Sequence, residues 1–163
     1  MKRLTRMSLL TALALIIFTV EAQIPPLVPI PGVKLGLANI ITVYAMFCLG
    51  PRDTLMILLC RVFLGSVFSG QMMTLAYSLS GGLLCYAVML GMRKLVTEKQ
   101  IWVCSVVGAI AHNIGQIIAA IAIAKTVQLI VYLPVLLISG ILAGLVTGLA
   151  AQYTIQRLRK INI

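Results

Sequence analysis

Long apolar stretches are the feature that most limits how this chain can fold. An α-helix needs about 20 apolar residues to cross the hydrocarbon core of a bilayer, with a usable range of about 17 to 25. Six candidate stretches follow one another, and only 10% of the 163 residues are charged, against about 25% in a typical soluble domain. Since lipid offers no partner to exposed backbone groups, such stretches must be helical. The sequence therefore predicts an all-α integral membrane protein.

The six apolar stretches predict six transmembrane helices. Their residue ranges are 7–23, 35–49, 54–69, 72–92, 101–124 and 131–152. Gly50 and Pro51 separate the second from the third and force a tight turn. No linker or charge-rich block of the size of a soluble domain interrupts the series, so we expect a single transmembrane domain over residues 1–163. We interpret the first stretch as a retained helix, because it lacks a convincing signal-peptide cleavage site.

The basic residues predict the orientation in the membrane, because Lys and Arg in short loops are retained on the cytoplasmic side. With the amino terminus inside, ten of the 13 basic residues fall on the cytoplasmic side. Lys34 and Lys125 fall outside, and Arg61 lies within a helix. Both termini are therefore expected to be cytoplasmic. The basic residues lie at segment ends and not on one soluble face, so nucleic acid is not an expected partner.

The chain lacks the residue patterns of catalytic and metal sites. One histidine and three acidic residues leave no metal-ligand cluster, no paired carboxylates and no Ser-His-Asp arrangement. There is no Walker A pattern and no acidic motif for diphosphate chemistry. We therefore expect no catalytic residue, metal, cofactor or enzymatic activity. The cysteines, in apolar stretches without Cys-x-x-Cys spacing, are expected to be small buried hydrophobic residues. They are Cys48, Cys60, Cys85 and Cys104.

Polar side chains at membrane depth indicate a binding site. At 1.5 Å per residue, the backbone of Arg61 lies about 10 Å and that of His112 about 16 Å from the inner boundary. The arginine can reach the level of the imidazole by extending outward. Gln116 lies on the same helical face as His112, and Asn113 lies about 100° around the helix. A charge at this depth costs at least about 2.5 to 3.5 kcal/mol, so it normally faces a cavity or a partner.

Further polar residues continue this set toward the outside of the membrane. The seven residues expected to bind a substrate are Glu21, Lys34, Asn39, Arg61, His112, Asn113 and Gln116. For Arg61 the alternative is a structural ion pair or a carbonyl cap, with Glu21 the acidic candidate on the outer side. For His112 the alternative is a hydrogen bond between helices.

Two further segments carry specific expectations. Residues 24–36 hold four of the six prolines and cannot be helical. They are either a stiff connector or a lid over an outward-facing cavity. Small residues spaced by four favour close helix contacts. We expect the repeat Gly140, Gly144 and Gly148 to pack inside the bundle, and Ser8 and Ala12 to dock a separate subunit.

Several motifs together resemble a known family. They read "VEAQIPPLVPIPGVKLGLANIITVYAMFCLGPRD", "RVFLGSVFSG", "YSLSGGLL", "GAIAHNIGQ" and "YLPVLLISGILAGLVTGLAA". Over nearly its whole length the chain resembles the Gx transporter family, also labelled heptaprenyl diphosphate synthase component I. That family is grouped with the substrate-binding S components of energy-coupling factor (ECF) transporters.

The resemblance implies a six-helix S-component bundle in the bacterial cytoplasmic membrane. Such a protein captures a vitamin-like solute from outside and docks on a transmembrane coupling subunit that is attached to two ATPase subunits. S components often dock through an Ala-xxx-Ala pattern on the first helix, and here Ser8 replaces one alanine. The resemblance thus implies a non-enzymatic importer subunit. The basic Arg61 and Lys34, beside the polar residues of the fifth stretch, suit a small polar or anionic solute. The alternatives are an accessory membrane protein of isoprenoid or quinone metabolism, and a structural membrane scaffold.

Overall fold

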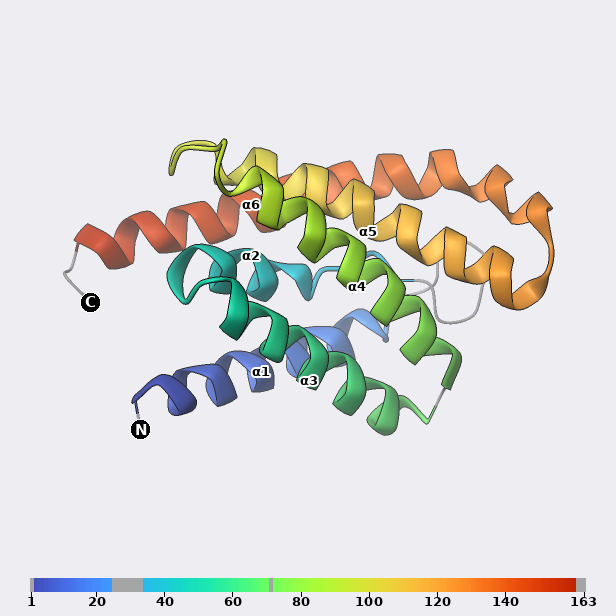
Figure 1. Ribbon diagram of the computed structural model, residues 1–163, viewed down its shortest axis with the longest axis horizontal. Helices are drawn as coiled ribbons and strands as arrows, with labels where there is room; N and C mark the ends of the chain where they lie inside the picture. Colours follow the sequence, from blue (N-terminus) through green and yellow to red (C-terminus); the bar gives the residue numbers. More distant parts are fainter. Residues whose placement is uncertain (1, 25–33, 71, 161–163) are drawn as a thin grey trace.

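The computed structural model describes residues 2–24, 34–70 and 72–160, and all regular structure among them is helical. The elements are α1 (Lys2–Glu21), α2 (Asn39–Cys48), α3 (Pro51–Ser69), α4 (Met72–Met92), α5 (Ile101–Ala124), the 3-10 helix η1 (Val127–Tyr132) and α6 (Leu133–Lys160). They form an elongated bundle in which the N- and C-terminal ends lie at the same end (Figure 1). The common side predicted for the two termini agrees with this arrangement. Which side of the membrane they occupy stays a prediction, as does the single domain.

Four segments are long and apolar enough to cross a membrane: Lys2–Glu21, Met73–Met92, Ile101–Ala124 and Val127–Lys160. This chain is therefore a multi-pass membrane protein. All six predicted helices are present, but six complete spans are not confirmed. α2 has only 10 residues, so it covers about 15 Å of a core about 30 Å thick. α3 has the length for a crossing but carries three charged residues, Arg52, Asp53 and Arg61.

The ends of the helices differ from the predicted ranges where polar residues continue the helix beyond the apolar stretch. α1 begins at Lys2, five residues before the predicted start, and α6 continues to Lys160. The last turn of α6 contains Arg157, Arg159 and Lys160. Basic side chains are favourable there, because the carboxyl end of a helix carries a partial negative charge.

Close contacts through glycines join α5 to α6. A Cβ atom added at Gly144 would lie 2.9 Å from the Cα of Val106, and one at Gly148 would lie 2.8 Å from the Cα of Trp102. Between them the hydroxyl oxygens of Ser105 and Thr147 are 3.1 Å apart, a hydrogen bond across the interface. The predicted internal packing of the glycine repeat is confirmed.

A similar contact joins α4 to α5. A Cβ atom at Gly115 would lie 2.8 Å from the Cα of Gly81, and the Ser80 hydroxyl donates a hydrogen bond of 2.7 Å to the Gly115 carbonyl. The two backbones therefore approach each other with no room for a side chain. This contact fixes the part of α5 that carries His112 and Gln116.

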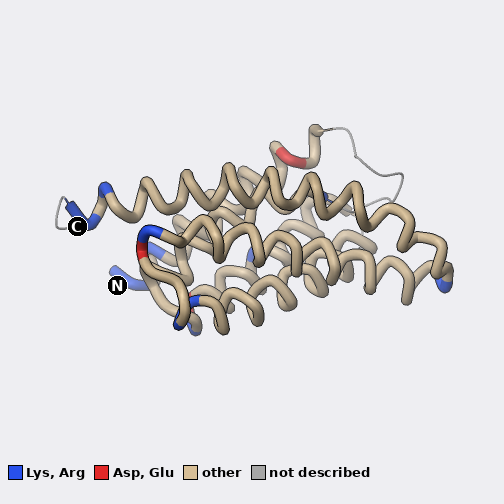
Figure 2. The backbone as a smooth tube through the Cα atoms, turned by 90° about the horizontal axis from the view of Figure 1, so that it is seen from above, with Lys and Arg blue, Asp and Glu red and all other residues tan. Residues whose placement is uncertain are grey.

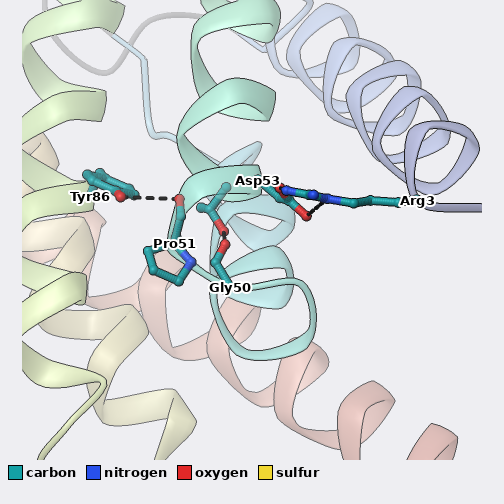
Figure 3. Close-up of polar contacts among 6 residues, drawn as sticks. Arg3, Gly50, Pro51, Asp53 and Tyr86 are labelled. Atoms are coloured by element: carbon teal, nitrogen blue, oxygen red, sulfur yellow. Dashed lines mark hydrogen bonds and ion pairs between the residues drawn. The ribbon is translucent and has the colours of Figure 1, made fainter.

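The turn between α2 and α3 is tied to two other helices (Figure 3). Gly50, at φ +100°, precedes Pro51, the first residue of α3. The Tyr86 hydroxyl of α4 donates a hydrogen bond of 3.2 Å to the Pro51 carbonyl. Arg3 of α1 forms an ion pair with Asp53, and its Nε donates a hydrogen bond of 2.9 Å to Asp53 Oδ2. Arg3 is exposed, while Asp53 is buried.

The cysteines are free, but only two of them are buried. Cys85 and Cys104 are buried as predicted, whereas Cys48 and Cys60 are exposed, so the predicted burial of these two is wrong. A membrane helix is apolar on its lipid-facing side as well as on its packed side, so an apolar neighbourhood does not indicate burial.

Replacing Gly115 by Val is expected to destabilise the protein, because the added atoms meet the α4 backbone. Overpacking of this kind costs about 1 to 3 kcal/mol. The measurement is the midpoint of thermal unfolding in detergent. Gly91→Ala is the matched control, since nothing lies within 4 Å of a Cβ atom there and alanine is the better helix former. Equal midpoints for the two variants would contradict the described contact.

Arg3→Met is expected to lower the unfolding midpoint in the wild-type background but not when Asp53 has been replaced by Asn. The reason is that the ion pair is already lost in the second background. A double-mutant cycle measures this coupling directly. Equal effects of Arg3→Met in both backgrounds would show that the two side chains do not interact.

Candidate functional site

Four of the polar residues predicted at membrane depth come together inside the bundle. Asn39 begins α2, Arg61 lies in α3, and His112 and Gln116 lie one turn apart in α5. All four are buried, and Gln116 is 0% exposed. We call these four residues the buried polar cluster.

Arg61 is held without a direct ionic partner. Its Nη2 donates a hydrogen bond of 3.4 Å to Asn39 Oδ1, which is longer than the usual range, and its Nε has no partner among the described residues. Glu21 interacts electrostatically with Arg61. In the described part of the chain, however, no carboxylate lies within 4.0 Å of the guanidinium. The ion pair with Glu21, one of the alternatives for this arginine, is not formed.

The segment between α1 and α2 covers the cluster where the structure describes it, from Lys34 onward. The Gly36 backbone N–H donates a hydrogen bond of 2.5 Å to Glu21 Oε1 at the end of α1. Gly36 has φ +83°, and a Cβ atom there would lie 3.0 Å from the His112 ring. Lys34 Nζ lies 3.5 Å from the centre of the Phe18 ring of α1, a cation–π contact. The proline-rich residues 25–33 lie outside the described residues, so the connector and lid interpretations stay predictions.

Gly81 of α4 forms the opposite wall of the cluster. A Cβ atom at this position would lie 2.9 Å from both Gln116 Cγ and His112 Cε1. Sequence reasoning missed the roles of Gly36 and Gly81. Glycines within "KLGLAN" and "SGGLL" were the available signal, since glycine often marks a close approach of the backbone to another group.

Asn113 lies beside the cluster but turns toward α6. Its Nδ2 donates a hydrogen bond to the Leu136 carbonyl, and it occupies the space that a side chain at Gly140 would need. The offset of about 100° from His112 along the helix explains this direction. Asn113 therefore joins α5 to α6, while its Oδ1 has no partner among the described residues.

Six buried polar atoms lack a hydrogen-bond partner within the described part of the chain. They are Asn39 Nδ2, Arg61 Nε, His112 Nδ1, Asn113 Oδ1, Gln116 Nε2 and Gln116 Oε1. Most buried polar atoms in proteins are paired, and each unpaired one costs about 1 to 3 kcal/mol. All six belong to residues predicted as substrate-binding. The arrangement offers both donors and acceptors to a bound molecule.

The structure also places the predicted docking residues Ser8 and Ala12. Ser8 and Ala12 lie one turn apart on the exposed side of α1. Large apolar side chains are exposed on the same helix, among them Leu9 and Ile16. In the described residues no group of three or more His, Cys, Asp or Glu side chains is placed to hold a metal ion. The binding and docking roles themselves stay predictions.

Comparison with known proteins identifies the family. Residues 10–154 match the family described as heptaprenyl diphosphate synthase component I. The comparisons with curated proteins and with solved structures give no match. The matched range contains the whole buried polar cluster and part or all of every helix. The chain therefore belongs to the heptaprenyl diphosphate synthase component I family, which is the Gx transporter family that the sequence motifs resemble.

Proposed function

We propose that this protein is the substrate-binding membrane subunit, or S component, of an ECF-type importer that takes up a vitamin-like small solute. The supporting observation is the set of six unpaired polar atoms buried in an apolar bundle. Binding sites for small molecules combine apolar walls with a few convergent polar groups. A solute bound here would form hydrogen bonds with polar atoms that have no partner among the described residues.

The polar atoms indicate the chemistry of the solute. Arg61 Nε and Asn39 Nδ2 are donors, and the Gln116 amide presents both a donor and an acceptor. The arginine is permanently charged, and no carboxylate pairs with it among the described residues. Charge-assisted hydrogen bonds are stronger than neutral ones. The site therefore suits a small polar solute that carries an anionic or strongly accepting group beside Arg61 and an amide-like edge beside Gln116.

Solute entry from outside requires the segment over the cluster to open. Gly36 lies against His112, and its contact with Glu21 together with the Lys34–Phe18 contact holds it there. These contacts have to break for this segment to move. We infer that residues 34–38, which precede α2, form the gate of the binding site.

The exposed Ser8–Ala12 face of α1 is the proposed docking face for the coupling subunit. Small residues let another helix approach closely, and α1 leaves this face uncovered in the described chain. Two ATPase subunits, as separate chains, would supply the energy. The description of the family favours one other candidate, an accessory membrane protein of heptaprenyl diphosphate synthesis.

Small molecules released from the purified protein are expected to include one polar solute whose retention depends on Arg61. Arg61→Ala should reduce its affinity by more than about tenfold, because losing one partner of a buried charged hydrogen bond costs about 2 to 5 kcal/mol. Mass spectrometry of the released molecules, followed by equilibrium binding, measures this. Arg52→Ala, which removes an exposed arginine of the same helix, should leave retention unchanged. Unchanged affinity in a folded Arg61→Ala protein would rule out the role of Arg61, and recovery of a prenyl diphosphate would favour the second candidate.

Ser8→Trp and Ala12→Trp are each expected to weaken capture of the coupling subunit and the ATPases without changing solute retention. The bulky ring prevents close approach of a partner helix. Co-purification with the tagged chain measures capture, and Leu83→Trp, at an exposed position of α4, is the control. If the intact chain never captures this module under conditions that preserve other ECF complexes, the importer proposal fails.

A further inference from the structure

A cavity that contains none of the residues of the buried polar cluster lies at one end of the bundle. It has a volume of about 320 Å³ and lies between the start of α1, the end of α2 and the end of α6. This is the end of the molecule where the two termini lie (Figure 1). α1 and α6 do not pack directly against each other in the described chain, so the cavity separates them.

Two arginines line this cavity, Arg6 from α1 and Arg159 from α6. Most of the Lys and Arg positions lie at the same end of the bundle (Figure 2). Arg159 forms an ion pair with Glu98. Arg6 has no carboxylate or hydrogen-bond partner in the described part of the chain. An arginine that lines a cavity without a partner is available to bind an anion.

The acidic residues of the chain leave one of the two cavity arginines, Arg6, without a carboxylate partner. There are only three. Asp53 is paired with Arg3, Glu98 with Arg159, and Glu21 binds Gly36 at the end of α1. The positive charge of Arg6 is therefore uncompensated. The other residues that line the cavity are mostly apolar and include Leu10, Phe47, Ile155 and Leu158.

We propose that this cavity binds an anionic phospholipid, with the headgroup phosphate between Arg6 and Arg159 and the upper part of an acyl chain against the apolar walls. Basic pockets between transmembrane helices on the cytoplasmic side are suited to anionic headgroups, and this end is the one predicted to be cytoplasmic. A free phosphate ion gains nothing from the apolar walls, whereas a lipid uses both parts of the cavity. The bound phosphate links α1 to α6, and the proposal does not depend on the solute bound at the other site.

Native mass spectrometry of the intact chain, released from nanodiscs with equal amounts of phosphatidylglycerol and phosphatidylcholine, tests the proposal. The wild type is expected to retain phosphatidylglycerol in preference to phosphatidylcholine. In the double variant Arg6→Gln, Arg159→Gln, the ratio of retained phosphatidylglycerol to retained phosphatidylcholine should fall at least about tenfold, since two charge-assisted contacts are removed. The double variant Arg52→Gln, Arg93→Gln removes the same charge outside the cavity and should behave as the wild type. Leu9→Trp, at an exposed lining position, should block the lipid without a change of charge.

Thermal unfolding establishes that each variant is folded. Equal losses in the two double variants would show only a general attraction of basic protein for anionic lipid and would overturn the proposal. Displacement of the lipid by millimolar inorganic phosphate would point to a free anion as the occupant. If the cavity double variant keeps its lipid but loses the coupling subunit, the cavity docks protein and the lipid proposal is wrong.

Discussion

Polar groups inside an apolar bundle need partners, and this need is the constraint on which the structure depends. Helices satisfy their own backbone groups, so the bundle can be built almost entirely from apolar and small residues. Side chains such as Arg61 and Gln116 do not contribute to such packing, and their unpaired atoms make the bundle less stable. Keeping the four residues of the buried polar cluster together on three helices is understandable if a solute completes their hydrogen bonds. Functional sites commonly retain groups that are unfavourable for stability.

The surrounding structure is arranged so that the cluster stays closed and narrow. Glycine contacts hold α4 against α5 and α5 against α6, which fixes the positions of His112 and Gln116. Gly36 and its bond to Glu21 close the remaining side. Close glycine contacts therefore join α4, α5 and α6, whereas the proposed gate is residues 34–38, before α2. A subunit that binds a solute and later releases it needs both a fixed binding site and a segment that can open.

The sequence predicted the helices well because lipid demands long apolar stretches, and α5 has the predicted bounds. Counting residues from the membrane boundary also placed Arg61 near His112, since helical rise is constant. The sequence did not predict that α2 begins at Asn39. Residues 35–38 are apolar enough for a helix, yet they form the turn that covers His112. Hydropathy does not separate lipid-facing from packed positions, so Cys48 and Cys60 were assigned wrongly. The cavity between Arg6 and Arg159 joins residues from opposite ends of the chain, and no local pattern indicates it.

We propose that the buried polar atoms are retained for a solute and not for the fold. Thermal unfolding of the wild type and of Gln116→Leu, each as purified and again after exhaustive dialysis in detergent, tests this most directly. We expect dialysis to lower the midpoint of the wild type but not that of Gln116→Leu, and we expect the dialysed variant to be at least as stable as the dialysed wild type. The opposite result is a dialysed variant with a lower midpoint than the dialysed wild type, and a midpoint that falls on dialysis by as much as that of the wild type. This result would show that Gln116 stabilises the fold and would contradict a role in solute binding.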